Sequence, residues 1–206
     1  MKKILFNDKF CLTQSVLSGI KTMTRRKFTL TLDKKVDGKF TQIQPSKVFF
    51  DNDKWFFDYN GKTYNVPKEN YPRYKVGEVV AIAQSYHTLN KAGYIAPECC
   101  EYTNESSAGY KNKMFVRADL MPHHIKITDI KVEHLQDISD EDILCEGVWQ
   151  ILSNNLFYIS KNVGFAHTVA FPSAREAFEY LIDKVSGDGT WTSNPLVVVY
   201  KFELVD

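Results

Sequence analysis

The sequence predicts an α+β fold, a small mixed or antiparallel β-barrel that carries two or three helices. Two observations lead to this expectation. Short runs rich in β-branched and aromatic residues outnumber the amphipathic helical segments, and they do not alternate regularly with helices as in a parallel sheet. In addition, 44% of the 206 residues are hydrophobic, enough for a buried core. We expect one domain over 1–206, with insertions near 33–72, 85–112 and 149–170.

The first predicted helix lies near the N-terminus. Thr13 is its expected N-cap, and Gly19 is expected to end it. Val16, Leu17 and Ile20 fall on one helical face. This helix is expected to present the residues that follow Gly19 at a fixed place.

Two more helices have start and stop signals. Ser139–Asp142 opens one with acidic residues where the helix dipole favours them, and Gly147 closes it after Glu146. Ser173–Glu176 is a capping box that opens the other. The apolar face of that last helix is formed by Ala174, Phe178, Leu181, Ile182 and Val185.

The remaining ordered segments are expected to be strands. Asn60-Gly61 is typical of a type I′ hairpin turn. The expected strands are Lys27–Leu32, Val48–Phe50, Trp55–Tyr59, Lys62–Val66, Val79–Ala83, Lys113–Val116, Ile125–Val132 with an irregularity near Thr128, and Leu196–Val205. Residues 33–46 are expected to be a loop, 85–112 an insertion or mobile loop, and 149–170 a hairpin or loop insertion.

Composition excludes several classes of function. The net charge of +1 gives no global polyanion signal, so any nucleic-acid contact must come from a local patch. The apolar run that opens the chain is too short for a signal peptide, and no stretch approaches membrane-spanning length. The four cysteines (Cys11, Cys99, Cys100 and Cys145) lack zinc-ligand spacing, and the five histidines form no metal motif. We expect reduced thiols in a cytoplasmic protein with no membrane partner and no cofactor.

The stretch Gly19–Arg26 concentrates the chemistry. Lys21, Thr24, Arg25 and Arg26 place four cationic or hydroxyl groups within six positions, which favours an anion or a polar carbonyl as ligand. The alternative is a solvated basic turn without a role.

Three separated segments together resemble one family. Gly19–Arg26 resembles the signature of ASCH domains, Ile127–Val148 resembles the strand-then-helix segment of phage-type ASCH proteins, and Gly189–Val199 resembles their closing tryptophan, asparagine-proline and strand. The order is that of the family, and the matches bracket nearly the whole chain.

The resemblance implies a PUA-like β-barrel with a cleft between barrel and helices, and a link to RNA binding. Some small bacterial members hydrolyse the acetyl amide of an acetylated cytidine nucleoside with a lysine, a threonine and a glutamate. Carried over by motif, these are Lys21, Thr24 and Glu146. Phage-type relatives often have a glutamate where this chain has Gln84, which cannot act as a general base.

The proposed chemistry of Lys21, Thr24 and Glu146 requires particular surroundings for each of them. A threonine hydroxyl needs a base to become a nucleophile, and a neutral lysine can serve if burial or neighbouring arginines lower its pKa. Glu146 would stand at a helix C-terminus, where the dipole disfavours a carboxylate, so it calls for a partner such as Lys21 or an arginine. The alternative is an ordinary exposed glutamate before a glycine cap.

The expected ligand-binding residues have structural alternatives. Arg25 and Arg26 can fork onto phosphate, although one of them is expected to pair with an acid. Tyr86 and Trp191 could stack on a base or belong to the core, and Asn194 could bind a base edge or hold a turn. The set is Gly19, Arg25, Arg26, Gln84, Tyr86, Trp191 and Asn194.

The first expectation for function is binding of RNA or a nucleotide-like ligand in a basic cleft. The alternatives are an amidohydrolase that deacylates a modified nucleoside through Lys21, Thr24 and Glu146, and an interaction protein of phage or mobile-element origin with a vestigial cleft. The sequence leaves the oligomeric state open.

Overall fold

The structure is a computed structural model that describes residues 1–36, 39–43, 45–94, 105–160 and 168–206. Its fold is α+β, as predicted, and its centre is a five-stranded mixed sheet with the order β1-β8-β9-β13-β2. The strands are β1 (Lys3–Ile4), β8 (Val79–Ile82), β9 (His124–His134), β13 (Leu196–Leu204) and β2 (Met23–Lys27). β1 pairs parallel to β8, and the other neighbours in this sheet are antiparallel.

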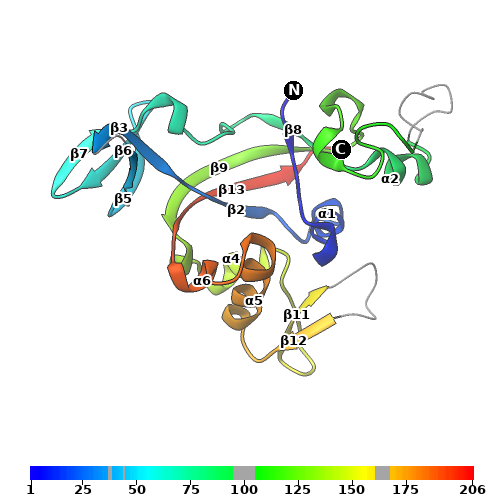
Figure 1. Cartoon of the computed structure of the whole chain (residues 1–206). Helices are drawn as coiled ribbons and strands as arrows, with labels where there is room; N and C mark the ends of the chain where they lie inside the picture. Colours follow the sequence, from blue (N-terminus) through cyan, green and yellow to red (C-terminus); the bar gives the residue numbers. More distant parts are fainter. Residues whose placement is uncertain (37–38, 44, 95–104, 161–167) are drawn as a thin grey trace.

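The two long strands β9 and β13 form the middle of the sheet (Figure 1). Leu196–Tyr200 is an unbroken buried run, as expected for a strand covered on both faces. The register passes from Lys201 opposite Asp129 to Phe202 opposite Ile127, so Thr128 is an extra residue on β9. The irregularity predicted near Thr128 is confirmed as a β-bulge.

A closed barrel is the wrong prediction. In the part of the chain that the structure describes, the edge strands β1 and β2 do not pair with each other, so the sheet is open. The reason is that the segments after β2 pair among themselves instead of closing the sheet. They form a hairpin of β3 (Leu30–Val36) and β4 (Lys39–Ile43), and a three-stranded sheet of β5 (Lys47–Asp51), β6 (Lys54–Tyr59) and β7 (Lys62–Asn65) at one end of the molecule (Figure 1).

Several strand predictions are confirmed. Asn60 and Gly61 both have positive φ, 50° and 72°, which the type I′ turn between β6 and β7 requires. Residues 149–170 contain the predicted hairpin. Its strands are β10 (Trp149–Ile151) and β11 (Leu156–Ser160), and β12 (Thr168–Phe171) pairs with β11.

Other predicted elements differ from the structure in their position or in their type. The strand expected over Lys27–Leu32 is interrupted at Phe28, whose N–H donates to Leu196 O at 2.9 Å, and β3 and β4 occupy much of the expected loop 33–46. Lys113–Phe115 is a 3₁₀ turn (η3) instead of a strand, because Asn112 accepts a bond from Met114 N at 3.0 Å and caps it. The predicted insertion 85–112 includes a helix, α2 (Tyr86–Lys91), capped by Ser85, while 95–104, with Cys99 and Cys100, lies outside the described residues.

The described part of the chain has five α-helices, more than the two or three predicted, because α2 and a four-residue turn were missed. The others are α1 (Leu12–Leu17), α4 (Asp140–Leu144), α5 (Ala174–Ser186) and α6 (Thr190–Ser193). Short 3₁₀ turns also occur at η1 (Asp8–Phe10), η2 (Lys68–Asn70), η4 (Ala118–Leu120) and η5 (Leu135–Asp137). Both predicted serine caps are confirmed: Ser139 Oγ accepts from Asp142 N at 3.1 Å, and Ser173 Oγ accepts from Glu176 N at 3.2 Å.

The start of α1 differs from the prediction. Its N-cap is Cys11, in a left-handed conformation with φ of 53°, while Thr13 lies inside the helix and its hydroxyl donates to Asp8 Oδ1 at 2.5 Å. Ile20 is 50% exposed, so it does not extend the apolar face. Gly19, with φ of 73°, follows the helix end as predicted.

Helices α4, α5 and α6 lie on the same side of the sheet (Figure 1). Ala174, Phe178 and Leu181 of α5 are buried, and Ile182 and Val185 pack on the core while half-buried. The predicted apolar face of α5 is therefore confirmed, and its last turn remains partly open. No helix in the described ranges is both long and apolar enough to cross a bilayer.

Candidate functional site

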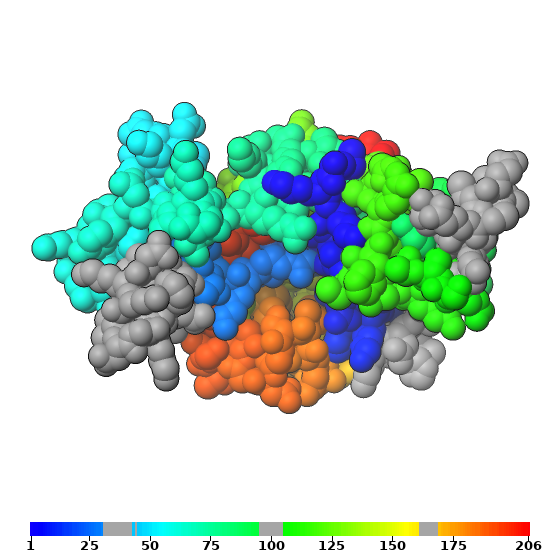
Figure 2. Space-filling model, turned by 45° about the horizontal axis from the view of Figure 1, so that its top comes forward, coloured from blue at the N-terminus to red at the C-terminus, as the bar shows by residue number. Residues whose placement is uncertain are grey.

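A cavity of about 240 Å³ lies along β2, at the edge of the main sheet. In Figure 2 the mid-blue strand β2 lies between the orange helix α5 and the blue-green chain that includes residues near 70. Four parts of the chain line the cavity: the N-terminal segment, the stretch that includes β2, the residue after α4 and its cap, and the last two turns of α5. The lining residues include Phe6, Asn7, Leu12, Lys21, Thr24, Arg25, Arg26, Lys27, Glu146, Phe178, Leu181, Ile182 and Val185.

The backbone brings Lys21 and Glu146 together across 125 positions. Thr22 N and Met23 N both donate to Cys145 O, at 2.9 and 3.0 Å, and tie the start of β2 to the end of α4. Gly147 has φ of 99°, and a Cβ there would lie 3.0 Å from Leu12 Cδ2, so the turn needs glycine. Glu146 is thereby turned inward, and the exposed-glutamate alternative is wrong.

Lys21 and Glu146 form a buried ion pair. Lys21 Nζ lies 2.5 Å from Glu146 Oε2 and donates to the backbone oxygen of Glu146 at 2.8 Å. The two side chains are only 2% and 6% exposed. Burial lowers the pKa of Lys21, while Glu146 opposes this shift and Arg26 and Arg25 add to it. The direction of this shift is the one that a lysine acting as a base requires.

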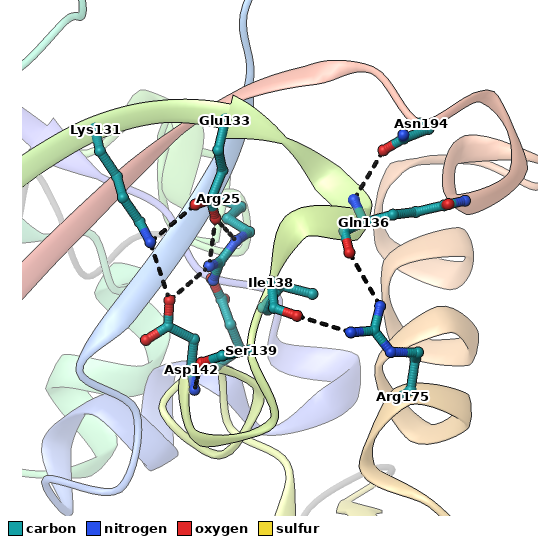
Figure 3. Close-up of polar contacts among 10 residues, drawn as sticks. Arg25, Lys131, Glu133, Gln136, Ile138, Ser139, Asp142, Arg175 and Asn194 are labelled. Atoms are coloured by element: carbon teal, nitrogen blue, oxygen red, sulfur yellow. Dashed lines mark hydrogen bonds and ion pairs between the residues drawn. The ribbon is translucent and has the colours of Figure 1, made fainter. Parts of the chain in front are cut away.

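Arg25 is held by three carboxylates, of which those of Glu133 and Asp142 are labelled in Figure 3. Its guanidinium donates to Glu146 Oε1 at 2.9 Å, to Glu133 Oε1 at 2.7 Å and to Asp142 Oδ2 at 3.0 Å. Lys131 joins the same group, 2.8 Å from Glu133 and 3.3 Å from Asp142. Burial disfavours the Arg25 charge, but Glu146 and Glu133 outweigh it and raise the pKa of Arg25.

These side chains form what we call the ion cluster. Its members are Lys21, Arg25, Lys131, Glu133, Asp142 and Glu146. Three cations face three carboxylates, so the cluster has no net charge when all six are ionised. The expectation that one of Arg25 and Arg26 pairs with an acid is confirmed for Arg25, and the solvated-turn alternative is wrong because Lys21, Thr24 and Arg25 are buried.

Arg26 and Lys27 differ from Arg25, since both are exposed. No carboxylate lies within 4 Å of either cation in the described part of the chain. The Arg26 guanidinium donates to Leu5 O and lies 6.0 Å from the Phe6 ring centroid. Thr24 is on the same strand, is buried and lines the cavity. Within the described ranges the Thr24 hydroxyl makes no hydrogen bond with Lys21 or Glu146.

The other expected ligand-binding residues do not line this cavity. Gln84 and Tyr86 are buried, and the Tyr86 hydroxyl accepts from Arg117 N at 2.8 Å. Trp191 is 9% exposed and packs edge-on against Phe178, with ring centroids 6.0 Å apart.

Asn194 has a left-handed backbone and accepts from Gln136 N at 2.8 Å, which holds the turn before β13 (Figure 3). Gly19 ends α1 and is absent from the residues that line the cavity. Asn194 therefore has the structural role that the sequence left open beside base recognition.

Sequence reasoning missed several residues of the site. Neither Glu133 nor Asp142 was assigned to the site, although Lys131 and Glu133 alternate with Ile130 and Val132 and so mark a charged face of β9. Phe6 and the end of α5 carried no signal beyond their apolar character. The sequence around Phe6 and the end of α5 does not indicate that these residues line the cavity beside β2.

The comparisons with known proteins add no relative. No family model matches the chain, and neither the curated proteins nor the solved structures gave a match.

Proposed function

We propose that the protein binds a nucleotide-like ligand, free or as part of RNA, in the cavity beside β2. The observation that carries this proposal is the opposition of two walls. One wall consists of Thr24 and three members of the ion cluster, Lys21, Arg25 and Glu146, and the other is the apolar end of α5 with Leu181, Ile182 and Val185. A planar heterocycle matches this pair of walls, because its faces are apolar and its edge carries donors and acceptors.

The charged residues of the site are expected to contact two different parts of the ligand, its polar base edge and its phosphate. The ion cluster is neutral when all six groups are ionised, and Lys21, Arg25 and Glu146 are buried, so these residues offer oriented polar groups instead of a net positive field. Arg26 and Lys27, exposed and without a carboxylate partner among the described residues, supply the positive charge at the cavity rim. They are the expected contacts for a phosphate, and Arg25 is not, because its donors are already taken.

The cavity is small enough that we expect it to hold only the base of a nucleotide and not the whole nucleotide. Its volume of about 240 Å³ lies below the roughly 300–1,000 Å³ typical of pockets that enclose a drug-sized molecule. A single base fits this description better than a complete nucleotide.

The second candidate is an amidohydrolase that acts on an acylated cytidine. It is favoured by one observation: Lys21, Thr24 and Glu146 line the same cavity, and the Lys21 pKa is lowered by burial. In this reading Thr24 is the nucleophile that attacks the acyl carbonyl, Lys21 is the base that takes its proton, and Glu146 orients Lys21 or shuttles the proton to the leaving amine. The reaction requires the Thr24 hydroxyl to come within hydrogen-bond reach of Lys21 when substrate binds.

We also propose that the chain is an ASCH domain with an open variant of the PUA-like sheet. The support is the convergence of the three residues carried over by motif, Lys21, Thr24 and Glu146, on one cavity. An experimental structure superposed on an ASCH domain tests this assignment, and a different strand order around β2 would exclude it.

Filling the cavity tests the binding proposal. Val185→Trp places a bulky ring at the apolar wall and should abolish binding of cytidine and of a short oligoribonucleotide in isothermal titration calorimetry. Lys184→Trp is the matched control, because Lys184 is exposed on the same helix and does not line the cavity, and it should bind as the wild type does. Equal affinity of wild type and Val185→Trp, or no binding of either ligand by the wild type, would refute the proposal.

A further inference from the structure

A second and larger cavity, of about 450 Å³, also borders β2. Its walls are Arg26, Lys27, Val198 and Tyr200 of the sheet on one side and the segment 69–74 on the other. In Figure 2 this blue-green segment lies on the side of β2 away from α5. Neither the sequence motifs nor the proposed base pocket includes Arg73 or Tyr74.

The charge on this cavity is positive. Arg26, Lys27 and Arg73 are exposed on its walls, and Glu69 is the one acidic side chain among its described lining residues. No carboxylate within the described ranges comes within 4 Å of Arg73. The surrounding protein removes part of the hydration of the Arg26 guanidinium although the side chain is exposed, which lowers the pKa of Arg26, and Arg73 adds to this shift by repulsion. Two guanidinium groups that line one cavity, with no carboxylate within 4 Å of either in the described residues, favour an anion between them.

Arg73 is held in place by aromatic residues. Its backbone N–H donates to the Tyr200 hydroxyl at 2.9 Å, and its guanidinium lies 5.6 Å from the Tyr74 ring centroid. Tyr74 packs edge-on against Tyr200 at 5.1 Å, and its hydroxyl donates to Lys3 O at 2.8 Å. The backbone at Arg73 is therefore fixed before any ligand arrives, and the Tyr74 ring lies beside the guanidinium, which reduces the entropy cost of binding.

Arg26 and Lys27 line both cavities, so the two sites adjoin at these cations. A ligand that fills both must cross β2 there and would place its negative charge beside Arg26. A polynucleotide strand can fill two cavities in this way, because each of its phosphodiester groups, which are negatively charged, lies between two bases.

We propose that the cavity between β2 and residues 69–74 binds the phosphodiester and second nucleotide of a single-stranded RNA whose first base occupies the pocket beside α5. This inference rests on the proposed function and narrows its ligand from nucleotide-like molecules to an RNA strand. A duplex is excluded as the bound form, because its bases are paired and cannot enter separate cavities. The expected minimal ligand is a dinucleotide.

The test compares cytidine, CMP, the ribodinucleotide CpC and inorganic phosphate by isothermal titration calorimetry on the full chain. The wild type should bind CpC at least about tenfold more tightly than cytidine, because the dinucleotide adds charge-assisted hydrogen bonds. Arg73→Ala should weaken CpC binding about tenfold, flatten its salt dependence and leave cytidine binding unchanged. Lys75→Ala is the control, an exposed cation two residues away that does not line the cavity, and it should behave as the wild type does.

The outcomes separate this inference from the proposed function. Cytidine binding together with equal CpC affinity in the wild type and Arg73→Ala would overturn the second site and leave the base pocket intact. If Lys75→Ala lost as much CpC affinity as Arg73→Ala, the second site would also be overturned, because the loss would then reflect the net charge of the protein and not a contact with Arg73. Binding of phosphate without cytidine or CpC would overturn the proposed function and the RNA assignment together.

Discussion

Glu146→Gln is expected to lower the free energy of unfolding by about 3 kcal/mol, the lower end of the range for removing one partner of a buried ion pair. The variant keeps the shape of the side chain and removes its charge. Lys21 then has no carboxylate partner among the described residues and stays 2% exposed, whereas Arg25 keeps Glu133 and Asp142. The cost stays at the lower end because Lys21, whose pKa is already lowered by burial, can release its proton.

The pH dependence of this variant follows from the same shift. Without Glu146 the folded-state pKa of Lys21 falls further below its unfolded value, so the unfolded state binds more protons over that interval. The stability of Glu146→Gln should therefore rise with pH through the interval and recover part of the loss. Urea unfolding at a series of pH values measures both effects.

Glu203→Gln is the control for this prediction. Glu203 lies 3.9 Å from Lys126 in an exposed pair, and its loss should change the free energy of unfolding by less than about 1 kcal/mol. Equal stability losses for the two variants would mean that Glu146 is not the centre of a buried cluster.

Thr24→Ala is expected to abolish hydrolysis of an acylated cytidine that the wild type turns over. The hydroxyl would be used mainly in the transition state, so the affinity for substrate should change little. Lys21→Arg should also fail, because arginine cannot lose a proton to act as a base. Acetate release under saturating substrate, with affinity measured separately, distinguishes a lost step from lost binding.

Thr22→Ala is the matched control for this reaction. Thr22 is two residues away and does not line the cavity, so its hydroxyl should be dispensable. Wild-type turnover by both Thr24→Ala and Lys21→Arg would refute the mechanism. Absence of turnover in the wild type, with RNA still bound, would leave binding as the function.

The elements predicted correctly depend on local chemistry. Ser139 and Ser173 cap their helices by bonds to residues three positions on, and Asn60-Gly61 sets its hairpin through two adjacent backbone conformations. The bulge at Thr128 is visible as a break in alternation. Each of these signals is contained in a few consecutive residues.

The elements predicted wrongly depend on distant parts of the chain. Whether β1 and β2 pair to close a barrel depends on where the segments after β2 find their partners, and no local pattern shows that these segments pair among themselves. Lys21, Thr24 and Glu146, the residues named from the resemblance, line one cavity. The partners of Arg25 come from β9, from α4 and from the residue after its cap, more than a hundred positions away, and were not predicted as a group. The cavity at Arg73 could not be predicted, because its walls are joined only by the folded sheet.

The salt dependence of oligoribonucleotide affinity tests the central claim most directly. Arg26 lines both cavities, is exposed and has no carboxylate partner in the described part of the chain. Arg26→Ala should therefore weaken binding about tenfold and reduce the slope of log K against log salt by about one, while Lys62→Ala, an exposed cation on β7, changes neither. A slope that is the same in wild type, Arg26→Ala and Lys62→Ala would contradict a nucleotide-binding groove along β2.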